Sequence, residues 1–405
     1  MKKNFLLSVV IPTKNREKYA SATVEQILNF NDDRIQIVIQ DNSDTRVLSD
    51  LLIKYKNDIR LKYNYTKGII SFVENFNLAV NQADGEYLCI IGDDDGIVPQ
   101  IIEAVLWAKN NNIDAIKPEL NAVYFWPNSE ALSTREDDGY LSINKITTNA
   151  KICNPYYEVE KLLKQGAQHY LSLDLVKLYH GIVRRDCLDD IKKVTGRYFG
   201  GLSPDIYMSV ALSLTVNKMV KIDFPLTISG ICNKSGSSDS ATGRHTGRLE
   251  DAPHFRGHLN YDWSALVPQF YSVDTIWADS ALAAIRDLKR SDLIKKFNVE
   301  FLTINCLLKY PQFKQAIIMN YKNYFHKNIF LVTTGIGAFF KYLFKGFFKK
   351  ILRKVSGKQS DYYRINGIEN ILVADETLQR RFKEIGIDTR TMLKSLNNAF
   401  GKVEN

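Results

Sequence analysis

The stretch EYLCIIGDDDGIVPQ, residues 86–100, joins a strand pattern to an acidic turn and a helix pattern. An apolar run typical of a buried strand leads directly into Asp93, Asp94 and Asp95, and a helical pattern begins near Pro99. Three like charges on one tight turn repel one another, so their coexistence needs a cause. Either they surround a bound divalent cation, or they form a solvated acidic turn. Their place at the end of a buried strand favours the cation.

The segments around this stretch alternate between strand and helix patterns, which is typical of an α/β domain with a mostly parallel sheet. We expect strands over 6–11, 35–40, 59–65, 86–91 and 115–118, and helices over 20–30, 71–82 and 99–110. Ligands of such sheets bind beyond the carboxyl ends of the strands. The candidate ligand-binding positions are therefore 13–16, 41–44, 65–68 and 93–95.

Composition limits the classes of protein that remain. The 405 residues are 45% hydrophobic and 24% charged, which is ordinary for a globular protein. Five scattered cysteines without C-x-x-C spacing indicate reduced, cytoplasmic thiols rather than disulfides or a zinc site. The short apolar stretch at the N-terminus lacks a cleavage site, so we expect a first strand there and no signal peptide.

The net charge of +9 is concentrated in one region. Residues 301–360 contain 11 lysines and arginines and no acidic residue, so the remaining chain is slightly negative. A local basic segment argues against a general nucleic-acid-binding surface. The chain also lacks G-x-G-x-x-G and G-x-x-x-x-G-K-[ST], which removes the main support for a dinucleotide oxidoreductase or a P-loop protein.

Four segments in order carry a family resemblance: VVIPTKNR (9–16), IVIQDNSD (37–44), the segment 68–87 and IIGDDDGIVP (90–99). Together they resemble the family 2 inverting glycosyltransferases of bacterial surface-polysaccharide biosynthesis. The resemblance is strong over 5–120 and weaker to about 230. It implies an α/β GT-A fold, in which a Rossmann-like, mostly parallel sheet forms the nucleotide-sugar domain.

The resemblance also implies site residues. Thr13 and Asp41 would hold the nucleobase and ribose of a nucleotide-sugar, usually a UDP-sugar, although Asp41 equally suits an Asx-type turn. The metal, Mn²⁺ or Mg²⁺, would bind at Asp93, Asp94 and Asp95, which fits the preference of these ions for carboxylates together with substrate phosphates. Because Gly92 stands where the family usually has its first aspartate, Asp94 is the expected principal ligand. Further nucleotide-sugar contacts are expected from Pro12, Asn15, Arg16, Lys67, Asn77, Asp93 and Asp94.

The catalytic base of this family is an aspartate at a later helix start, and Asp205 in LSPDIYM (202–208) fits that position. Ser203 can cap the helix, Pro204 suits its first turn, and the positive helix end should keep Asp205 ionised. The alternative is an ordinary helix opening without chemistry.

The second half of the chain carries weaker signals. Residues 126–149 are polar and turn-rich and suggest a loop or hinge, whereas 156–232 mix helix and strand patterns and the chain is helical from about 272. The loop 235–248 contains Arg244 and His245, which could clamp a diphosphate when the loop closes as a lid, or could simply be solvated. We therefore expect a nucleotide-sugar-binding half (1–120), an acceptor-binding half (121–250), a helical region (251–330) and a C-terminal helical element (357–405).

Between the last two parts lies GAFFKYLFKGFFKKILRKV, residues 337–355. Its lysines and arginine recur every four residues on one helical face and its phenylalanines lie on the other. This pattern predicts a C-terminal membrane-associating extension, a helix over 331–356 lying on anionic inner-leaflet lipids. A helix packed on the protein's own core is the alternative.

The sequence thus predicts a cytoplasmic, peripheral-membrane, metal-dependent inverting glycosyltransferase. Its donor would be a nucleotide-sugar, in the first place a UDP-sugar, and its acceptor an undecaprenyl-diphosphate-linked glycan. One rival is a sugar-1-phosphate nucleotidyltransferase, which would carry a Gly-rich basic loop where this chain has PTKNR. The other is a catalytically inert, membrane-bound scaffold.

Overall fold

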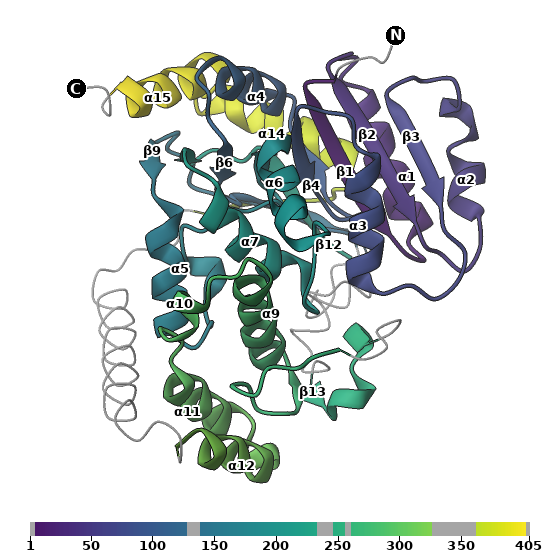
Figure 1. Ribbon diagram of the computed structural model, residues 1–405. Coiled ribbons are helices and arrows are strands. Elements are labelled where there is room, and N and C mark those ends of the chain that lie inside the picture. The colour runs from purple at the N-terminus through teal and green to yellow at the C-terminus, as the bar shows by residue number, and fades with distance from the viewer. Residues whose placement is uncertain (1–4, 128–137, 233–245, 256–260, 326–361, 402–405) are drawn as a thin grey trace.

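The computed structural model describes residues 5–127, 138–232, 246–255, 261–325 and 362–401 (Figure 1). Its main sheet has eight strands in the order β3-β2-β1-β4-β10-β6-β11-β9. The first half, β1 (Leu7–Thr13), β2 (Ile35–Asp41), β3 (Leu61–Tyr65) and β4 (Tyr87–Ile90), is parallel. The other strands are β6 (Ala115–Pro118), β9 (Ala150–Cys153), β10 (Ile182–Arg184) and β11 (Met219–Ile222). Because β10 and β9 run antiparallel to their neighbours, the sheet is mixed and the fold is α/β.

Alternation along the central strands sorts the side chains into two cores. Val9 and Ile11 point toward α1 (Glu17–Leu28) and α4 (Gln100–Asn110), whereas Val10 points toward α3 (Phe72–Gln82) and the later helices. Successive side chains of a strand face opposite sides, so a strand covered by helices on both faces must be apolar throughout. This explains the continuous apolar runs that predicted β1, β2 and β4.

Helices dominate the rest of the second core. They are α5 (Pro155–Lys164), α6 (Arg185–Thr195), α7 (Pro204–Thr215), α9 (Val273–Asp287), α10 (Ser291–Ile294), α11 (Val299–Lys309) and α12 (Lys314–Phe325). The predicted helical character from about 272 is confirmed for these described residues. Helix α6 was not expected, although its high amphipathicity buries Cys187, Leu188 and Ile191.

A second sheet has five strands in the order β15-β8-β7-β12-β5. Its strands are β5 (Gly96–Ile97), β7 (Ala122–Phe125), β8 (Tyr140–Asn144), β12 (Thr227–Ile231) and β15 (Tyr362–Asn366). The expectation of a loop over 126–149 was wrong for β8, because Leu141 and Ile143 are buried in alternation with outward residues. The strand expected over 219–228 is divided into β11 and β12, which belong to different sheets.

The C-terminal residues return to the beginning of the chain. Helix α14 (Ile371–Glu384) lies beside α1, and helix α15 (Thr389–Gly401) lies beside α4 (Figure 1). Gln26 Nε2 of α1 donates to Asp375 Oδ2 (2.9 Å), and Trp107 Nε1 of α4 donates to Asn397 Oδ1 (2.7 Å). A Cβ at Gly96 would overlap Ile371. The C-terminal helices are therefore part of the core that supports the acidic turn.

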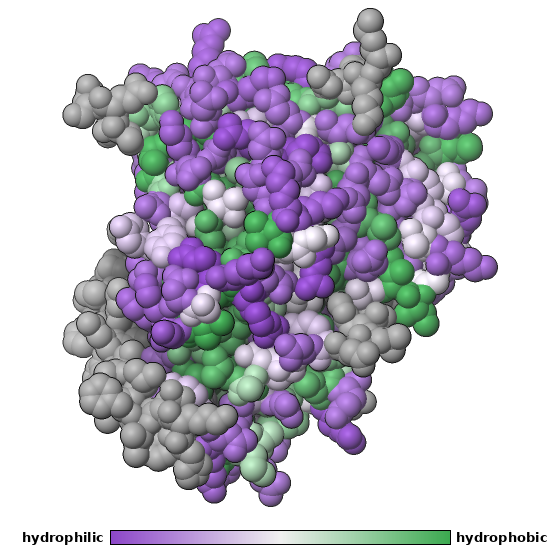
Figure 2. All heavy atoms as spheres, viewed as in Figure 1, coloured by the Kyte–Doolittle hydropathy of each residue, from purple (hydrophilic) through white to green (hydrophobic). Residues whose placement is uncertain are grey.

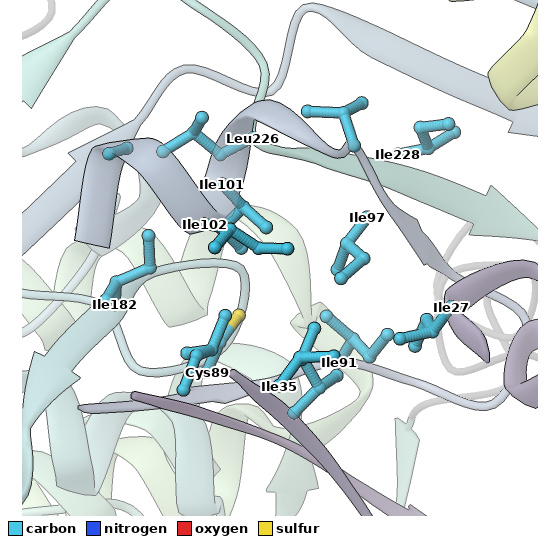
Figure 3. Close-up of a cluster of buried hydrophobic side chains, with 14 of the residues drawn as sticks. Ile27, Ile35, Cys89, Ile91, Ile97, Ile101, Ile102, Ile182, Leu226 and Ile228 are labelled. Atoms are coloured by element: carbon cyan, nitrogen blue, oxygen red, sulfur yellow. The ribbon is translucent and has the colours of Figure 1, made fainter. Parts of the chain in front are cut away.

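Figure 3 shows this core from inside, with Ile91 and Ile97 on either side of the acidic turn. Ile27 of α1, Ile101 of α4 and Ile228 of β12 surround them, and all five side chains are fully buried. The three aspartates thus extend from a rigid layer of buried apolar side chains, and this layer fixes the backbone of the turn.

Two predicted features fall outside the described residues. They are the basic segment 331–356 and most of the loop 235–248, of which residues 246–248 are described, including the short strand β13 (Thr246–Gly247), paired with β14 (Tyr271–Ser272). Among the residues that are placed, no helix has the length and apolar character needed to cross a bilayer. The face seen in Figure 2 is mostly hydrophilic, with hydrophobic side chains in small groups.

Candidate active site

The carboxyl ends of β1, β2 and β4 meet, as the sequence predicted. Thr13 and Asp41 are direct partners in the β1–β2 register. Thr13 Oγ1 also donates a hydrogen bond of 2.6 Å to Asp93 Oδ2 in the turn after β4. The structure therefore brings three of the candidate donor-site residues together at one edge of the sheet.

Arg16 partly compensates the charge of the turn. Its Nη1 donates to Asp93 Oδ1 at 2.8 Å and lies 3.6 Å from Asp94 Oδ1. Burial opposes the charge of Arg16, but Asp93 and then Asp94 hold the pKa of its guanidinium above the ordinary value. Burial raises the pKa of Asp93, against the opposing effect of Arg16. Asp93 is therefore committed to two protein partners, Thr13 and Arg16.

Asp95 has the most hydrogen-bond donors of the three aspartates. Its Oδ1 accepts from Gly230 N (2.7 Å), and its Oδ2 accepts from Gly92 N (2.6 Å) and the Tyr179 hydroxyl (3.0 Å). His180 Nε2 lies 3.3 Å from the same Oδ2. Both carboxylate oxygens of Asp95 accept hydrogen bonds, and these bonds connect the turn to β12 and to the segment before β10. Asp95 therefore has a structural role in the turn.

Asp94 is held by Cys232 and Arg16. Its Oδ2 accepts a long hydrogen bond from Cys232 N (3.2 Å), and Arg16 reaches Oδ1 only at 3.6 Å. Burial, followed by the charges of Asp95 and Asp93, raises the pKa of Asp94 to about 7. β12 approaches so closely that a Cβ at Gly230 would overlap the Asp94 carbonyl. Asp94 is thus held rigidly while its carboxylate retains the capacity to bind a ligand.

These contacts bear on the expected metal. Within the described parts of the chain, no cluster of three or more His, Cys, Asp or Glu side chains is arranged to hold an ion. Mg²⁺ and Mn²⁺ at nucleotide sites often need only one or two carboxylates, with substrate phosphates completing the shell. Asp94 fits that role, and Asp95, whose oxygens are occupied, fits it poorly. Metal binding by Asp93, Asp94 and Asp95 remains a prediction.

The loops after β1 and β2 are joined to each other. Asp41 is fully buried; its Oδ1 accepts from Ser43 N (2.8 Å) and its Oδ2 from the Tyr63 hydroxyl (2.8 Å). Asn15 has a left-handed backbone (φ 56°) and exchanges hydrogen bonds with Asp44. The Asx-type turn considered for Asp41 therefore forms. A nucleotide contact from Asp41 or Asn15 stays a prediction.

The remaining donor-site candidates lie in different places. Pro12 is half-buried at the end of β1, and Lys67 is exposed after β3. Asn77 lies within α3, where its Oδ1 accepts from the backbone amides of Tyr198 and Phe199 (3.0 Å each) and its Nδ2 donates to Phe199 O (2.9 Å). Its amide is thus used to fasten α3 to the α6–α7 connection. Arg244 and His245 lie outside the described residues.

Asp205 is the second residue of α7 and is half-buried. Ser203 precedes the helix but makes no side-chain capping bond; its own N–H donates to Ser280 Oγ (2.9 Å) instead. Among the described residues, the Asp205 carboxylate accepts no hydrogen bond. Burial raises the pKa of Asp205 above its ordinary value, and Lys177 and His180 oppose that rise. Burial thus opposes the expected effect of the helix end on Asp205, and the catalytic role of Asp205 stays a prediction.

Several residues that hold the site were not found from the sequence. Thr23 of α1 donates to the carbonyl oxygens of Asp93 (3.0 Å) and Asp95 (2.7 Å), and Trp126 Nε1 donates to the Asp94 carbonyl (2.8 Å). The single signal for Thr23 was its polar side chain on the apolar face of a predicted helix. Tyr179 and His180 carried no local signal, because their partner lies more than 80 residues away.

Known proteins resemble parts of this chain. Residues 8–150 match the family described as Glycosyl transferase family 2. Glycosyltransferase GlyG of Streptococcus pneumoniae is 31% identical over 103 residues, which cover 25% of this chain and 34% of that protein. The GalNAc(5)-diNAcBac-PP-undecaprenol beta-1,3-glucosyltransferase of Campylobacter jejuni is 29% identical over 109 residues, covering 26% of this chain and 34% of that protein. The matches thus span about a third of the length of these curated relatives.

Among solved structures, S. aureus TarS 1–349 in complex with UDP-GlcNAc aligns with a TM-score of 0.44 at 15% identity. The alignment covers 78% of this chain and 89% of that one. The sequence match covers the parallel strands, the acidic turn and the chain from β7 to the start of β9. It therefore includes the elements that build the site at the carboxyl ends of β1, β2 and β4. Residues 8–150 are therefore similar in sequence to glycosyl transferase family 2 domains.

Proposed function

We propose that the protein is an inverting glycosyltransferase that moves a hexosyl or N-acetylhexosaminyl group from a nucleotide-sugar to a glycan. The observation that carries this proposal is Asp205, a half-buried carboxylate at the start of α7 that accepts no hydrogen bond among the described residues. The negative charge of Asp95 in the acidic turn adds to the effect of burial in raising the pKa of Asp205. A carboxylate without a protein donor is available to accept a proton.

The proposed reaction inverts the configuration at the anomeric carbon of the donor sugar, and its steps follow from that requirement. The acceptor hydroxyl gives its proton to Asp205 while its oxygen forms a bond to the anomeric carbon of the donor. The bond from that carbon to the diphosphate oxygen breaks on the opposite face, and the nucleotide diphosphate takes the electron pair. A general base works best when its pKa approaches the working pH, so the raised pKa of Asp205 makes it a stronger base than an exposed aspartate.

The donor would lie across the ends of β1, β2 and β4. Arg16, half-buried beside Asp93 and Asp94, is placed to offset the negative charge of the leaving diphosphate. Mn²⁺ or Mg²⁺ held by Asp94 would supply further positive charge there. Thr13 and Asp41 would orient the nucleoside, with Pro12, Asn15, Lys67 and Asn77 around it and Arg244 and His245 at the diphosphate. UDP is the first nucleotide to test.

The proposed acceptor is a lipid-linked glycan, in the first place one on undecaprenyl diphosphate, in the synthesis of a surface polysaccharide. Two observations support it. The Campylobacter jejuni relative is named for an undecaprenol-linked substrate. Residues 301–360 carry 11 basic and no acidic residues, which suits attachment to anionic lipids at the cytoplasmic face of a membrane.

The test is nucleotide release from UDP-, GDP- and dTDP-sugars, with Mn²⁺, Mg²⁺ or EDTA, with and without membrane-extracted lipid acceptors. We expect one donor to be turned over, and Asp205→Asn and Asp94→Asn to lower the rate by at least ~100-fold. Lys193→Met, an exposed residue of α6, is the matched control and should leave the rate unchanged.

Two outcomes would overturn the proposal. Pyrophosphate release from a nucleoside triphosphate and a sugar 1-phosphate would identify a nucleotidyltransferase instead. If the wild-type protein neither turns over nor binds any nucleotide when lipid acceptors are present, the catalytically inert scaffold would be the remaining alternative.

A further inference from the structure

A buried glutamine holds the chain that leaves the acidic turn. Gln26 of α1 is 2% exposed, and its side-chain amide binds the backbone of β5 at both ends. Its Nε2 donates to the Ile97 carbonyl (2.6 Å), and its Oε1 accepts from Ile97 N (3.3 Å). These two bonds fix the orientation of the amide. The second hydrogen of Nε2 therefore needs another acceptor in a place that water does not reach.

Asp375 of α14 supplies that acceptor. It is 7% exposed; its Oδ2 accepts from Gln26 Nε2 (2.9 Å) and its Oδ1 from Gln379 Nε2 (3.0 Å). Gln379 Oε1 in turn accepts from Gln100 Nε2 (2.6 Å) at the start of α4. The hydrogen bonds thus run from Ile97 through Gln26, Asp375 and Gln379 to Gln100. Both ends of this series belong to the segment that follows the acidic turn.

The acidic turn is also held from the same two helices. Thr23 of α1 donates to the carbonyl oxygens of Asp93 (3.0 Å) and Asp95 (2.7 Å). Helix α14 packs directly on the backbone of β5, since a Cβ at Gly96 would lie 2.7 Å from Ile371 Cγ1. The turn and the strand that follows it are therefore held between α1 and α14.

A carboxylate is a costly group at this position. Ala374 and Leu378, the neighbours of Asp375 in α14, are buried in the core on the α1 and α4 side of the main sheet. Burial raises the pKa of Asp375 to about 6, and the hydrogen bonds from Gln26 and Gln379 oppose that rise. An apolar side chain would avoid this desolvation but would leave the Gln26 amide without its acceptor. The contribution of Asp375 is therefore orientation, which apolar packing alone does not fix.

We propose that Asp375 is a positioning residue that fixes the acidic turn through Gln26 and thereby sets the affinity of the site for the nucleotide-sugar. The inference rests on the proposed function, which assigns the donor to this turn. Asp375 does not touch the donor; it acts through the backbone of β5. The Asp94 carboxylate depends on that backbone for its position, because the hydrogen bond that it accepts from Cys232 N is long (3.2 Å).

The first experiment needs no substrate. Hydrogen exchange at pH 7.5, followed by mass spectrometry, compares a peptide over 92–98 with one over 35–41 in β2. Asp375→Leu keeps the approximate shape of the side chain and removes both acceptor oxygens. Exchange over 92–98 should become about tenfold faster, while exchange over 35–41 stays within about twofold. Glu376→Gln, a change at the exposed neighbour in α14, is the matched control and should alter neither peptide. Equal acceleration of both peptides, or none over 92–98, would overturn the inference.

A double-mutant cycle tests whether Asp375 acts through Gln26. Gln26→Met keeps the length of the side chain and removes its amide, so alone it should accelerate exchange over 92–98 at least as much as Asp375→Leu does. Adding Asp375→Leu to Gln26→Met should then change that rate by less than about twofold. Additive effects would show that the two residues act independently, which would overturn the inference.

The second readout is the KM for the donor. In Asp375→Leu the KM for the nucleotide-sugar that the wild type turns over should rise about tenfold, and the KM for the acceptor should stay within about twofold. Asp375→Asn keeps one acceptor oxygen and should give an intermediate donor KM. Phe382→Ala weakens the packing of the same helix and, at a temperature where it stays folded, should leave the donor KM unchanged.

Two kinetic results would contradict the positioning role. They are an equal rise of both KM values in Asp375→Leu, and a rise of the donor KM in Phe382→Ala as large as that in Asp375→Leu. If the wild type turns over no donor, the proposed function is contradicted instead, and the exchange measurements alone decide whether Asp375 fixes the turn.

Discussion

Replacing Asp94 with asparagine should stabilise the metal-free protein at alkaline pH. Asp94 is 4% exposed, and burial together with Asp95 and Asp93 raises its pKa to about 7. A carboxyl group whose pKa is higher in the folded state than in the unfolded state favours folding most below the unfolded pKa. That contribution is lost as pH rises through the folded value. A difference of about three pKa units corresponds to at most ~4 kcal/mol above pH 7.

The assay is urea unfolding of wild type and Asp94→Asn in EDTA between pH 5 and 8.5. We expect the variant to be more stable by ~2–4 kcal/mol at pH 8 and by less than about 2 kcal/mol at pH 5, because asparagine carries no charge to desolvate and the wild-type carboxyl is already ionised in the unfolded state at pH 5. Mn²⁺ should stabilise the wild type at pH 8 and leave the variant nearly unchanged. Asp95→Asn is the contrast: Asp95 accepts hydrogen bonds from Gly92, Gly230 and Tyr179, so that variant should be less stable at every pH. An Asp94→Asn protein less stable than wild type at pH 8 would refute the reasoning.

Three further substitutions test how the site is supported, each measured by urea unfolding at pH 7.5 beside an exposed control, Lys193→Met. Gly230→Ala should cost ~1–3 kcal/mol, because its Cβ would overlap the Asp94 carbonyl; an unchanged midpoint would contradict that contact. Asn77→Ala should lower the free energy of unfolding by about 3 kcal/mol, since two backbone amides, one of them that of Phe199, would lose their hydrogen-bond acceptor. Phe382→Ala should lower the free energy of unfolding by ~3–5 kcal/mol, because its side chain is buried in the core on the α1 and α4 side of the main sheet. A smaller loss would mean that α14 contributes little to that core.

Sequence patterns predicted the donor edge because the information there is local. Parallel strands β1, β2 and β4 are buried on both faces, so apolar runs mark them and the polar residues that end them mark one edge of the sheet. The meeting of Thr13, Asp41 and Asp93 follows from that alone.

The supporting contacts could not be read in the same way. Asp95 is held by Gly230 and by Tyr179, 135 and 84 residues further along the chain. No local period in the sequence reports such a distance. The same holds for α14, whose amphipathic pattern predicts a helix but does not name α1 as its partner. Burial was the other quantity that the sequence did not report. The helix start at Asp205 was visible in S-P-D, but the burial that raises the pKa of Asp205 was not.

The three consecutive aspartates can coexist because they do not share one environment. Asp95 is neutralised by donors from three segments, Asp93 by Thr13 and Arg16, and the repulsion that remains falls on Asp94. A nucleotide diphosphate would bring more negative charge to this turn, so its binding is favourable only with added positive charge beside Asp94. In its proposed role as the base, Asp205 has the opposite requirement, since it would have to be ionised near the same acidic turn in order to take a proton. Arg16, which pairs with Asp93 and lies 3.6 Å from Asp94 Oδ1, supplies part of the positive charge that the donor side of the turn requires.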